Sequence, residues 1–213
     1  MHPRLRHLLL LVPVIAAIAC GGLIGPVLLM WGLARTSASS ASLLLNSEAV
    51  FTALIAWFVF RENFDRRIAL GMLLIVLGAA VLSWSGTPSL EGTLPSLAIV
   101  AASIAWALDN NLTRKVALAD ATTLAMLKGL AAGTINVVLA LASGASLPAP
   151  APLTVAAVLG FVSYGMSLVL FVTALRDLGT ARTAAYFSTA PFVGAILSVF
   201  ILHEPLTWRL GAA

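Results

Sequence analysis

The stretch AVFTALIAWFVFRE (Ala49–Glu62) has a counterpart near the end of the chain, PFVGAILSVFILHE (Pro191–Glu204). Both are apolar runs that end in a basic residue or a histidine followed by Glu. The second copy lies about five hydrophobic segments further along the chain than the first, and because this offset is odd, copies that span a membrane would run in opposite directions. An inverted repeat of this kind is typical of secondary transporters, whose substrate site lies near the bilayer midplane between the halves.

The composition predicts an all-α integral membrane protein. Of 213 residues, 61% are hydrophobic and 9% are charged, and the mean hydropathy is +1.05, whereas a soluble domain carries roughly 25% charged residues. Long apolar runs between short polar connectors favour helices over barrel strands, which would alternate with a period of two. The net charge of +4 requires no nucleic acid as a partner, because Lys and Arg gather on the cytoplasmic loops of membrane proteins.

The N-terminal segment has two readings. Arg4, Arg6 and His7 precede an apolar run that leads to Cys20, which resembles a signal peptide with a loose lipobox. The apolar run continues to Leu33, however, which is too long for a signal peptide and suits a spanning helix. We therefore interpret residues 9–34 as the first span. A single cysteine allows no internal disulfide and suggests no metal cluster.

The chain is predicted to contain about seven membrane-spanning helices, since each span needs about 20 apolar residues. They are expected at residues 9–34, 39–60, 67–85, 94–113, 122–144, 152–175 and 182–203. With the N-terminus in the cytoplasm, nine Lys and Arg residues fall on the cytoplasmic side and only Arg35 and Arg209 fall outside. This asymmetry follows the positive-inside rule. We expect a multi-pass protein of the bacterial inner (cell) membrane with a cytoplasmic N-terminus, embedded in the lipid bilayer.

A shift of 142 positions aligns the two copies. It maps Glu62 on Glu204 and Phe58 on Phe200, and it maps the first span on residues 152–175. A repeat of five helices would give a complete protein ten helices, of which this chain would lack two before residue 8 and one after residue 203. Residues 1–85 then hold three helices of the first repeat, and residues 93–213 hold four helices of the second.

Several motifs carry a resemblance to a known family. They are FVFRE (Phe58–Glu62), FILHEPLTWR (Phe200–Arg209), GMLLIVLGAAV from Gly71, and Ala190-Pro191-Phe192 in the second half. With them the chain resembles the EamA family of the drug/metabolite transporter superfamily over essentially its whole length. The resemblance implies ten helices in two inverted five-helix repeats and the transport of small metabolites.

Glu48 is the first candidate for a substrate-binding residue, as a site for the amine of a substrate or for a proton. It lies about ten residues into its predicted helix, about 15 Å deep and close to the midplane. A lone carboxylate there costs about 2.5–3.5 kcal/mol, so it should face the protein interior or a wet cavity. We predict a polar cavity between the halves, with Asn46, Thr52, Tyr164 and Tyr186 as candidate neighbours. The alternative is a protonated, hydrogen-bonded structural residue.

Asp109 and Lys128 form a second candidate site. They lie on consecutive antiparallel helices at matching depths, so we predict an ion pair that stabilises the fold or acts as a gate. The alternative is that Lys128 extends to the headgroups and Asp109 ends its helix. Pro26 and Pro191 interrupt helices at depth and free a carbonyl one turn back. Such breaks either line substrate sites or are plain kinks.

Two classes of function remain open. The first is a carrier of a small metabolite or drug-like molecule by alternating access, most simply an efflux carrier. The second is a truncated or non-transporting membrane subunit that needs a partner or the missing helices; a homodimer is one such arrangement. The sequence contains no nucleophile–base pair, phosphate loop or His/Cys metal spacing, so we expect neither an enzyme nor a cofactor or metal.

Overall fold

The computed structural model describes residues 11–35, 41, 44–63, 65–83, 93–116, 120–190, 193 and 200. These residues are helices and short connections, without a strand among them, which confirms the predicted all-α class. The elements, with η for a π-helix, are η1 (Ile18–Ile24), α2 (Gly25–Leu33), α4 (Ser47–Leu54), η2 (Ile55–Val59), α5 (Arg66–Ser83), α6 (Thr93–Val116), α7 (Ala121–Ala142), α8 (Pro150–Leu159), η4 (Gly160–Met166), α9 (Ser167–Leu178) and α10 (Thr180–Phe187).

Four helical stretches in the described part are long and apolar enough to cross a membrane. They are Leu11–Leu33, Thr93–Val116, Ala121–Ala142 and Pro150–Leu178. A shorter apolar helix, Ser47–Val59, covers much of the predicted span 39–60. The predicted span 182–203 is described only in part, by α10 and a few residues after it. The second copy of the terminal motif, including Pro191 and Glu204, lies outside the described residues apart from Val193 and Phe200.

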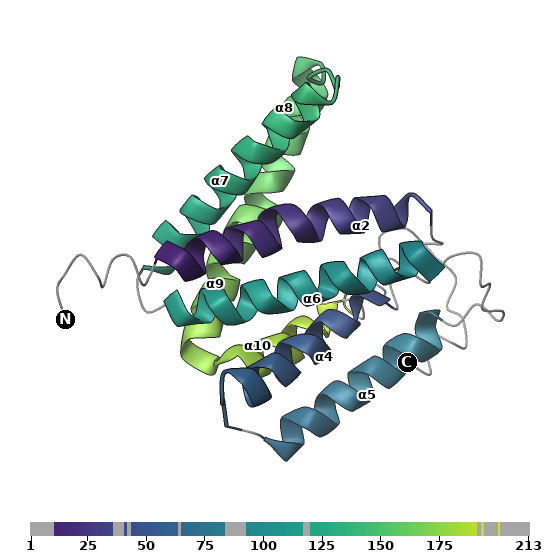
Figure 1. The fold of residues 1–213 in the computed structure, drawn as a ribbon, viewed down its shortest axis with the longest axis vertical. Helices are drawn as coiled ribbons and strands as arrows, with labels where there is room; N and C mark the ends of the chain where they lie inside the picture. The colour runs from purple at the N-terminus through teal and green to yellow at the C-terminus, as the bar shows by residue number, and fades with distance from the viewer. Residues whose placement is uncertain are drawn as a thin grey trace.

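Helix α6 occupies the middle of the bundle. It packs against α2 on one side and against α4 on the other, and α10 lies against α4 (Figure 1). Helix α5 lies at the outer edge of this body, in contact with α4 and α10. Helices α7 and α8 lean away from the body, and α8 has no buried residue (Figure 1). Polar side chains on α6 are therefore the ones best placed to meet the rest of the protein.

Small residues let the helices approach closely, as is common in membrane bundles. The cluster between α4, η2, α5 and α10 consists of Ala49, Ala53, Ala56, Met72, Ala181 and Ala184. A second cluster joins the end of α6 to α7 and α9 and consists of Val116, Ala121, Leu124 and Val172.

Helix α7 begins at an exposed N-cap outside the spans. The Asp120 carboxylate accepts hydrogen bonds from the backbone N–H groups of Thr122 (3.3 Å) and Thr123 (2.9 Å) and from the Thr123 hydroxyl (2.6 Å). The Thr123 hydroxyl, followed by these backbone donors, lowers the pKa of Asp120 from its usual value. A capped helix start at this point fixes where α7 leaves the connector after α6.

Two π-helices occur at related positions. Helix η1 covers Ile18–Ile24 and η4 covers Gly160–Met166, and each residue of η1 lies 142 positions before its counterpart in η4. Each π-helix also has two carbonyls that accept side-chain donors, at residues 21 and 22 in η1 and at residues 163 and 164 in η4. The register that aligned the sequence copies thus also aligns these helix irregularities.

The helical segments that contain α4 and α10 are also interrupted at related positions. A turn at Asn46 precedes α4, and the Ser47 hydroxyl donates to Leu44 O (2.5 Å). A turn at residues 188–189 follows α10, and the Thr189 hydroxyl donates to Tyr186 O (2.7 Å). Hydroxyls that bond a carbonyl three residues back compete with the regular helix. The predicted continuous helix 39–60 is therefore interrupted, and Glu48 lies in the first turn of its second part.

Candidate functional site

The Glu48 carboxyl meets Asn110 across the interface between α4 and α6. Asn110 Nδ2 donates to Glu48 Oε1 (3.1 Å) and lies 3.3 Å from Thr52 Oγ1, one turn further along α4. Glu48 is half-buried, whereas Thr52 is fully buried and Asn110 is only 7% exposed. The first turn of α4 also favours a negative charge, because the N-terminal end of a helix is the positive end of its dipole.

The next residue on α6 secures the same interface. Asn111 Nδ2 donates to the backbone carbonyl of Thr52 (3.1 Å) and to Ala107 O on its own helix (2.8 Å). Asn111 is only 2% exposed. Two neighbouring amides thus have different tasks, since Asn111 joins the backbones of α4 and α6 while Asn110 contacts the Glu48 side chain.

Asp109 and Lys128 lie on the other face of α6, where it meets α7. Lys128 Nζ donates to Asp109 Oδ1 (2.5 Å) and to Thr113 Oγ1 (2.8 Å), and the Thr113 hydroxyl donates to Asp109 Oδ1 (2.9 Å). Asp109 and Lys128 are each 8% exposed, and Thr113 is 1% exposed. The two side chains form the ion pair that their matching depths allow. Their role as a gate stays a prediction.

The sequence of helix η1 explains why two of its backbone carbonyls lack a hydrogen bond within the helix. Gly25 N–H reaches back five residues to Cys20 O, which frees the carbonyl of Gly21. Pro26 has no N–H to offer the carbonyl of Gly22, four residues back. Two backbone acceptors in the middle of a membrane span therefore need other donors.

Helices α6 and α7 supply those donors. Trp106 Nε1 donates to Gly21 O (3.0 Å), and Asn136 Nδ2 donates to Gly22 O (2.8 Å). Gly21 also lies against the Asp109 carboxylate, so closely that a methyl group at position 21 would overlap it. The carbonyl that Pro26 frees is thus used to attach η1 to its neighbours, which favours the structural alternative for this proline.

Glu62 caps a helix of the other predicted half. Its carboxylate accepts hydrogen bonds from Thr180 N (3.1 Å to each oxygen) and Ala181 N (3.4 Å) at the start of α10, and Arg114 Nε lies 3.0 Å from Oε1. Gly179, at a φ of 86°, lets the chain turn into this cap. The sequence singled out Glu62 only as a repeated helix end, whereas the structure shows that it joins η2, α6 and α10.

The remaining candidates are dispersed. Tyr164 on η4 is 61% exposed and Tyr186 on α10 is 69% exposed. Within the described residues, the hydrogen bond to Glu48 comes from Asn110 and none comes from either tyrosine. Asn46 is buried at the turn before α4, and Pro191 lies outside the described residues. The structure thus brings Glu48 and Thr52 together with Asn110, which was not among the neighbours expected for Glu48.

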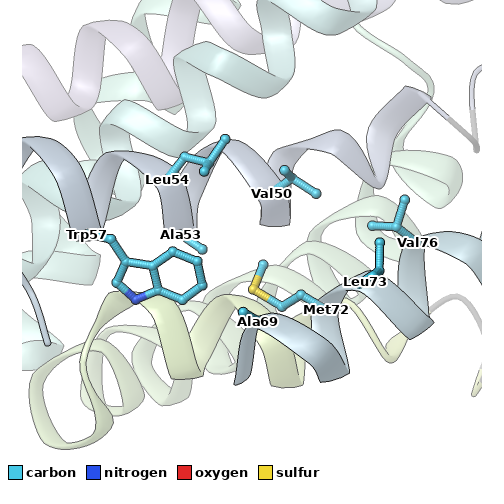
Figure 2. A pocket seen from close by; sticks show the side chains of 8 residues that line it. All are labelled: Val50, Ala53, Leu54, Trp57, Ala69, Met72, Leu73 and Val76. Atoms are coloured by element: carbon cyan, nitrogen blue, oxygen red, sulfur yellow. The ribbon is translucent and has the colours of Figure 1, made fainter. Parts of the chain in front are cut away.

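An apolar groove lies on the other side of α4. It has a volume of about 290 Å³, and Figure 2 shows its lining, which comes from α4, η2 and α5. The lining residues are Val50, Ala53, Leu54, Trp57, Ala69, Met72, Leu73 and Val76. The groove surface is almost wholly apolar and gives a ligand little orientation, so this groove fits an acyl chain or a further helix better than a polar substrate.

The described Asp, Glu, His and Cys side chains form no group of three that could hold a metal ion. The buried polar clusters instead consist of single acids, each with its own amide, hydroxyl or cationic partner. Such clusters can bind or release a polar ligand or a proton, or they can hold helices together.

Comparisons with known proteins agree with the fold. The chain is 30% identical over 194 residues to a protein of Methanothermobacter thermautotrophicus described as an uncharacterized transporter; the match covers 88% of this chain and 57% of that protein. It therefore spans little more than half the length of this curated relative. A solved crystal structure superposes with a TM-score of 0.77 at 16% identity, covering 94% of this chain and 82% of that one, and this likeness concerns the fold.

The family model for EamA-like transporters matches residues 2–84 and 93–213. Together these two stretches account for almost the whole chain. With its apolar helices, the protein is a multi-pass membrane protein, and it belongs to the EamA-like transporter family.

Proposed function

We propose that the chain carries a small molecule across the membrane by alternating access and that Glu48, Asn110 and Thr52 belong to its substrate site. The observation that carries the proposal is the half-buried Glu48 carboxyl, which lies at a helix interruption and is met by an amide of the other predicted half. Interrupted helices at the interface of two repeats are where carriers of this architecture bind their substrates. Motion of one half relative to the other would change this contact.

The division into two inverted repeats, residues 1–85 and 93–213, is part of this proposal. Its support is the register of 142 residues shared by the two π-helices, their side-chain-bonded carbonyls and the Ser47 and Thr189 hydroxyl bonds. Because η1 and η4 belong to different halves, these irregularities are candidates for the places where each half bends.

The proposed orientation puts the N-terminus in the cytoplasm of a bacterial cell. The Glu62–Arg114 pair and the Asp65–Arg182 pair (3.7 Å) bring the ends of η2 and α6 and the start of α10 to one side of the bundle. Arg114 and Arg182, two of the basic residues expected in the cytoplasm, therefore lie on the same side, which supports this orientation under the positive-inside rule. We further propose that the direction of transport is efflux.

The Asp109–Lys128 pair is proposed to act as a structural pair beside the substrate site or as a gate. It is buried and closed on itself, with Thr113 bonded to both partners. Opening this contact would expose two charges in the membrane, so it would occur only if another state of the carrier offered them new partners.

A second candidate function is a membrane subunit that transports only beside a partner, for example a second copy of the chain. The observation that favours it is the surface of α8 and η4, which contains no buried residue. Lipid or further helices would have to cover this surface.

A flux assay separates the two candidates. The chain is purified and reconstituted into proteoliposomes, and the uptake of labelled amino acids and amines is compared for wild type and for Glu48→Gln. We expect saturable uptake by the wild type and its loss in the variant. A wild type without uptake, which gains it only when a partner is added, would favour the subunit. Equal uptake by both proteins would remove Glu48 from the site.

A further inference from the structure

The geometry around Glu48 points to a substrate that presents an ammonium group, and we propose a protonated primary amine as the ligand of this site. The inference rests on the proposed function and adds the chemical class of the substrate. It rests on two observations: the donors near Glu48 already have partners or are buried, and several acceptors have no donor among the described residues.

The amide donors of the cluster are already used, and the Thr52 side chain, which carries the remaining hydroxyl donor, is fully buried. Asn110 has two amide hydrogens, and the two acceptors next to Nδ2 are Glu48 Oε1 and Thr52 Oγ1. The neighbouring amide of Asn111 is turned away, because its Nδ2 serves Thr52 O and Ala107 O. A ligand that needs donors, such as a carboxylate or a phosphate, would have to take them from contacts that hold α4 and α6 together.

The groups left over are acceptors. Among the described residues, Glu48 Oε2 receives no hydrogen bond, and neither does Asn110 Oδ1, although Asn110 is more than nine-tenths buried. Glu48 Oε1 accepts one bond and retains a second lone pair. Three unused acceptor positions on adjacent groups match the three N–H donors of a primary ammonium ion.

The cationic side chains that could pair with Glu48 in place of a ligand are bound elsewhere. Lys128 is bound to Asp109 and Thr113, and Arg114 is paired with Glu62. No salt bridge joins Glu48 to a Lys or Arg in the part of the chain that the structure describes. A cationic ligand would therefore give the Glu48 carboxylate its counter-ion, whereas an anion would meet an uncompensated negative charge.

The test is ligand-induced thermal stabilisation of the full chain in lipid nanodiscs at pH 7. The probes are two matched series with the same carbon skeletons, namely butylamine, butanol and butyrate, and phenylethylamine, phenylethanol and phenylacetate. Sodium chloride at equal ionic strength is included, because oxygen acceptors also suit a metal cation. We expect the amines to stabilise the wild type, and we expect the alcohols, the carboxylates and Na⁺ to have little effect.

The variants assign the effect to the site. Glu48→Gln keeps an acceptor for Asn110 but removes the charge, and it should weaken amine binding by about ten- to a hundredfold, the range for losing a hydrogen bond to a charged group. Asn110→Leu should weaken it to a lesser extent. Asp177→Asn, which also removes one negative charge but lies at the end of α9, should bind amines like the wild type.

Several results would overturn the inference: stabilisation by the carboxylates or by Na⁺ that matches the amines, no stabilisation by either amine, or amine binding that survives Glu48→Gln. If Glu48→Gln fails to fold, Glu48→Asp keeps the charge, and it should still prefer amines to carboxylates. The outcome is separable from the flux assay. Amine binding without transport would refute only the carrier, and transport of carboxylates by a protein that binds no amine would refute only the substrate class.

Discussion

The two faces of helix α6 carry polar clusters of opposite design. On the face towards η1 and α7, Asp109, Lys128 and Thr113 bond one another, and Asp109 is pressed against Gly21. On the face towards α4, Asn110 holds Glu48 through one oxygen and leaves acceptors without a donor among the described residues. One cluster is complete within the protein, and the other is incomplete without a ligand or water.

The two faces of α6 should differ in how much they contribute to stability and to ligand binding. A buried ion pair with its partners in place gains little from a ligand and loses much when one partner is removed. A carboxyl with an unused oxygen can gain contacts from a substrate, and its replacement should cost little stability. We therefore expect the closed face to control stability and the open face to control binding.

The largest effect is expected from breaking the closed cluster. Asp109→Asn or Lys128→Met should each lower the free energy of unfolding by about 3–5 kcal/mol, since either change leaves a buried charge without its partner. Thermal or denaturant unfolding of the reconstituted chain measures it. The Asp109→Asn/Lys128→Met double variant should lose less than the sum of the single losses; additive losses would indicate that the pair does not interact.

A smaller loss is expected from Gly21→Ala. The new methyl group would overlap the Asp109 carboxylate, and overpacking of this kind costs about 1–3 kcal/mol. Gly129→Ala on α7 is the matched control, because nothing among the described residues lies within 4 Å of a methyl group there. Unfolding measurements should show a loss for the first variant only; equal stability of the two would mean that η1 does not dock on Asp109.

A comparable or smaller effect is expected at Asn136. Replacing it by Leu leaves the Gly22 carbonyl without a donor, and an unsatisfied buried acceptor costs about 1–3 kcal/mol. The control restores the backbone donor: in the Pro26→Ala/Asn136→Leu double variant, the N–H of residue 26 can bond Gly22 O. This variant should regain stability relative to Asn136→Leu. A double variant that is less stable than Asn136→Leu would contradict this account of η1.

Much of this arrangement was predictable from the sequence. Hydrophobicity and run length indicated the spans, and the matching depths of Asp109 and Lys128 indicated that their side chains could meet. The sequence also marked Pro26 as an interruption of its helix. These inferences need only the length of a helix and the thickness of a bilayer.

The partners of the polar residues were not predictable in the same way. Asp109 and Asn110 are adjacent in sequence, but one step along a helix turns the side chain by about 100°. They therefore meet different helices, and hydrophobicity does not reveal which helix each one meets. The interruption at Asn46 was missed because Ser47 reads as an ordinary residue of an apolar helix, and the cap formed by Glu62 depends on a turn at Gly179 that is distant in sequence.

The smallest change in stability should accompany the largest change in function, and Glu48→Gln provides the most direct measurement. Gln still presents an oxygen to Asn110 Nδ2, so the free energy of unfolding should change by less than about 1 kcal/mol. Unfolding and amine binding should be measured on the same reconstituted sample, beside Asp109→Asn. We predict near wild-type stability with lost binding for Glu48→Gln and a large loss of stability for Asp109→Asn. A Glu48→Gln protein that is as unstable as Asp109→Asn, or that binds amines like the wild type, would contradict the division between the two faces of α6.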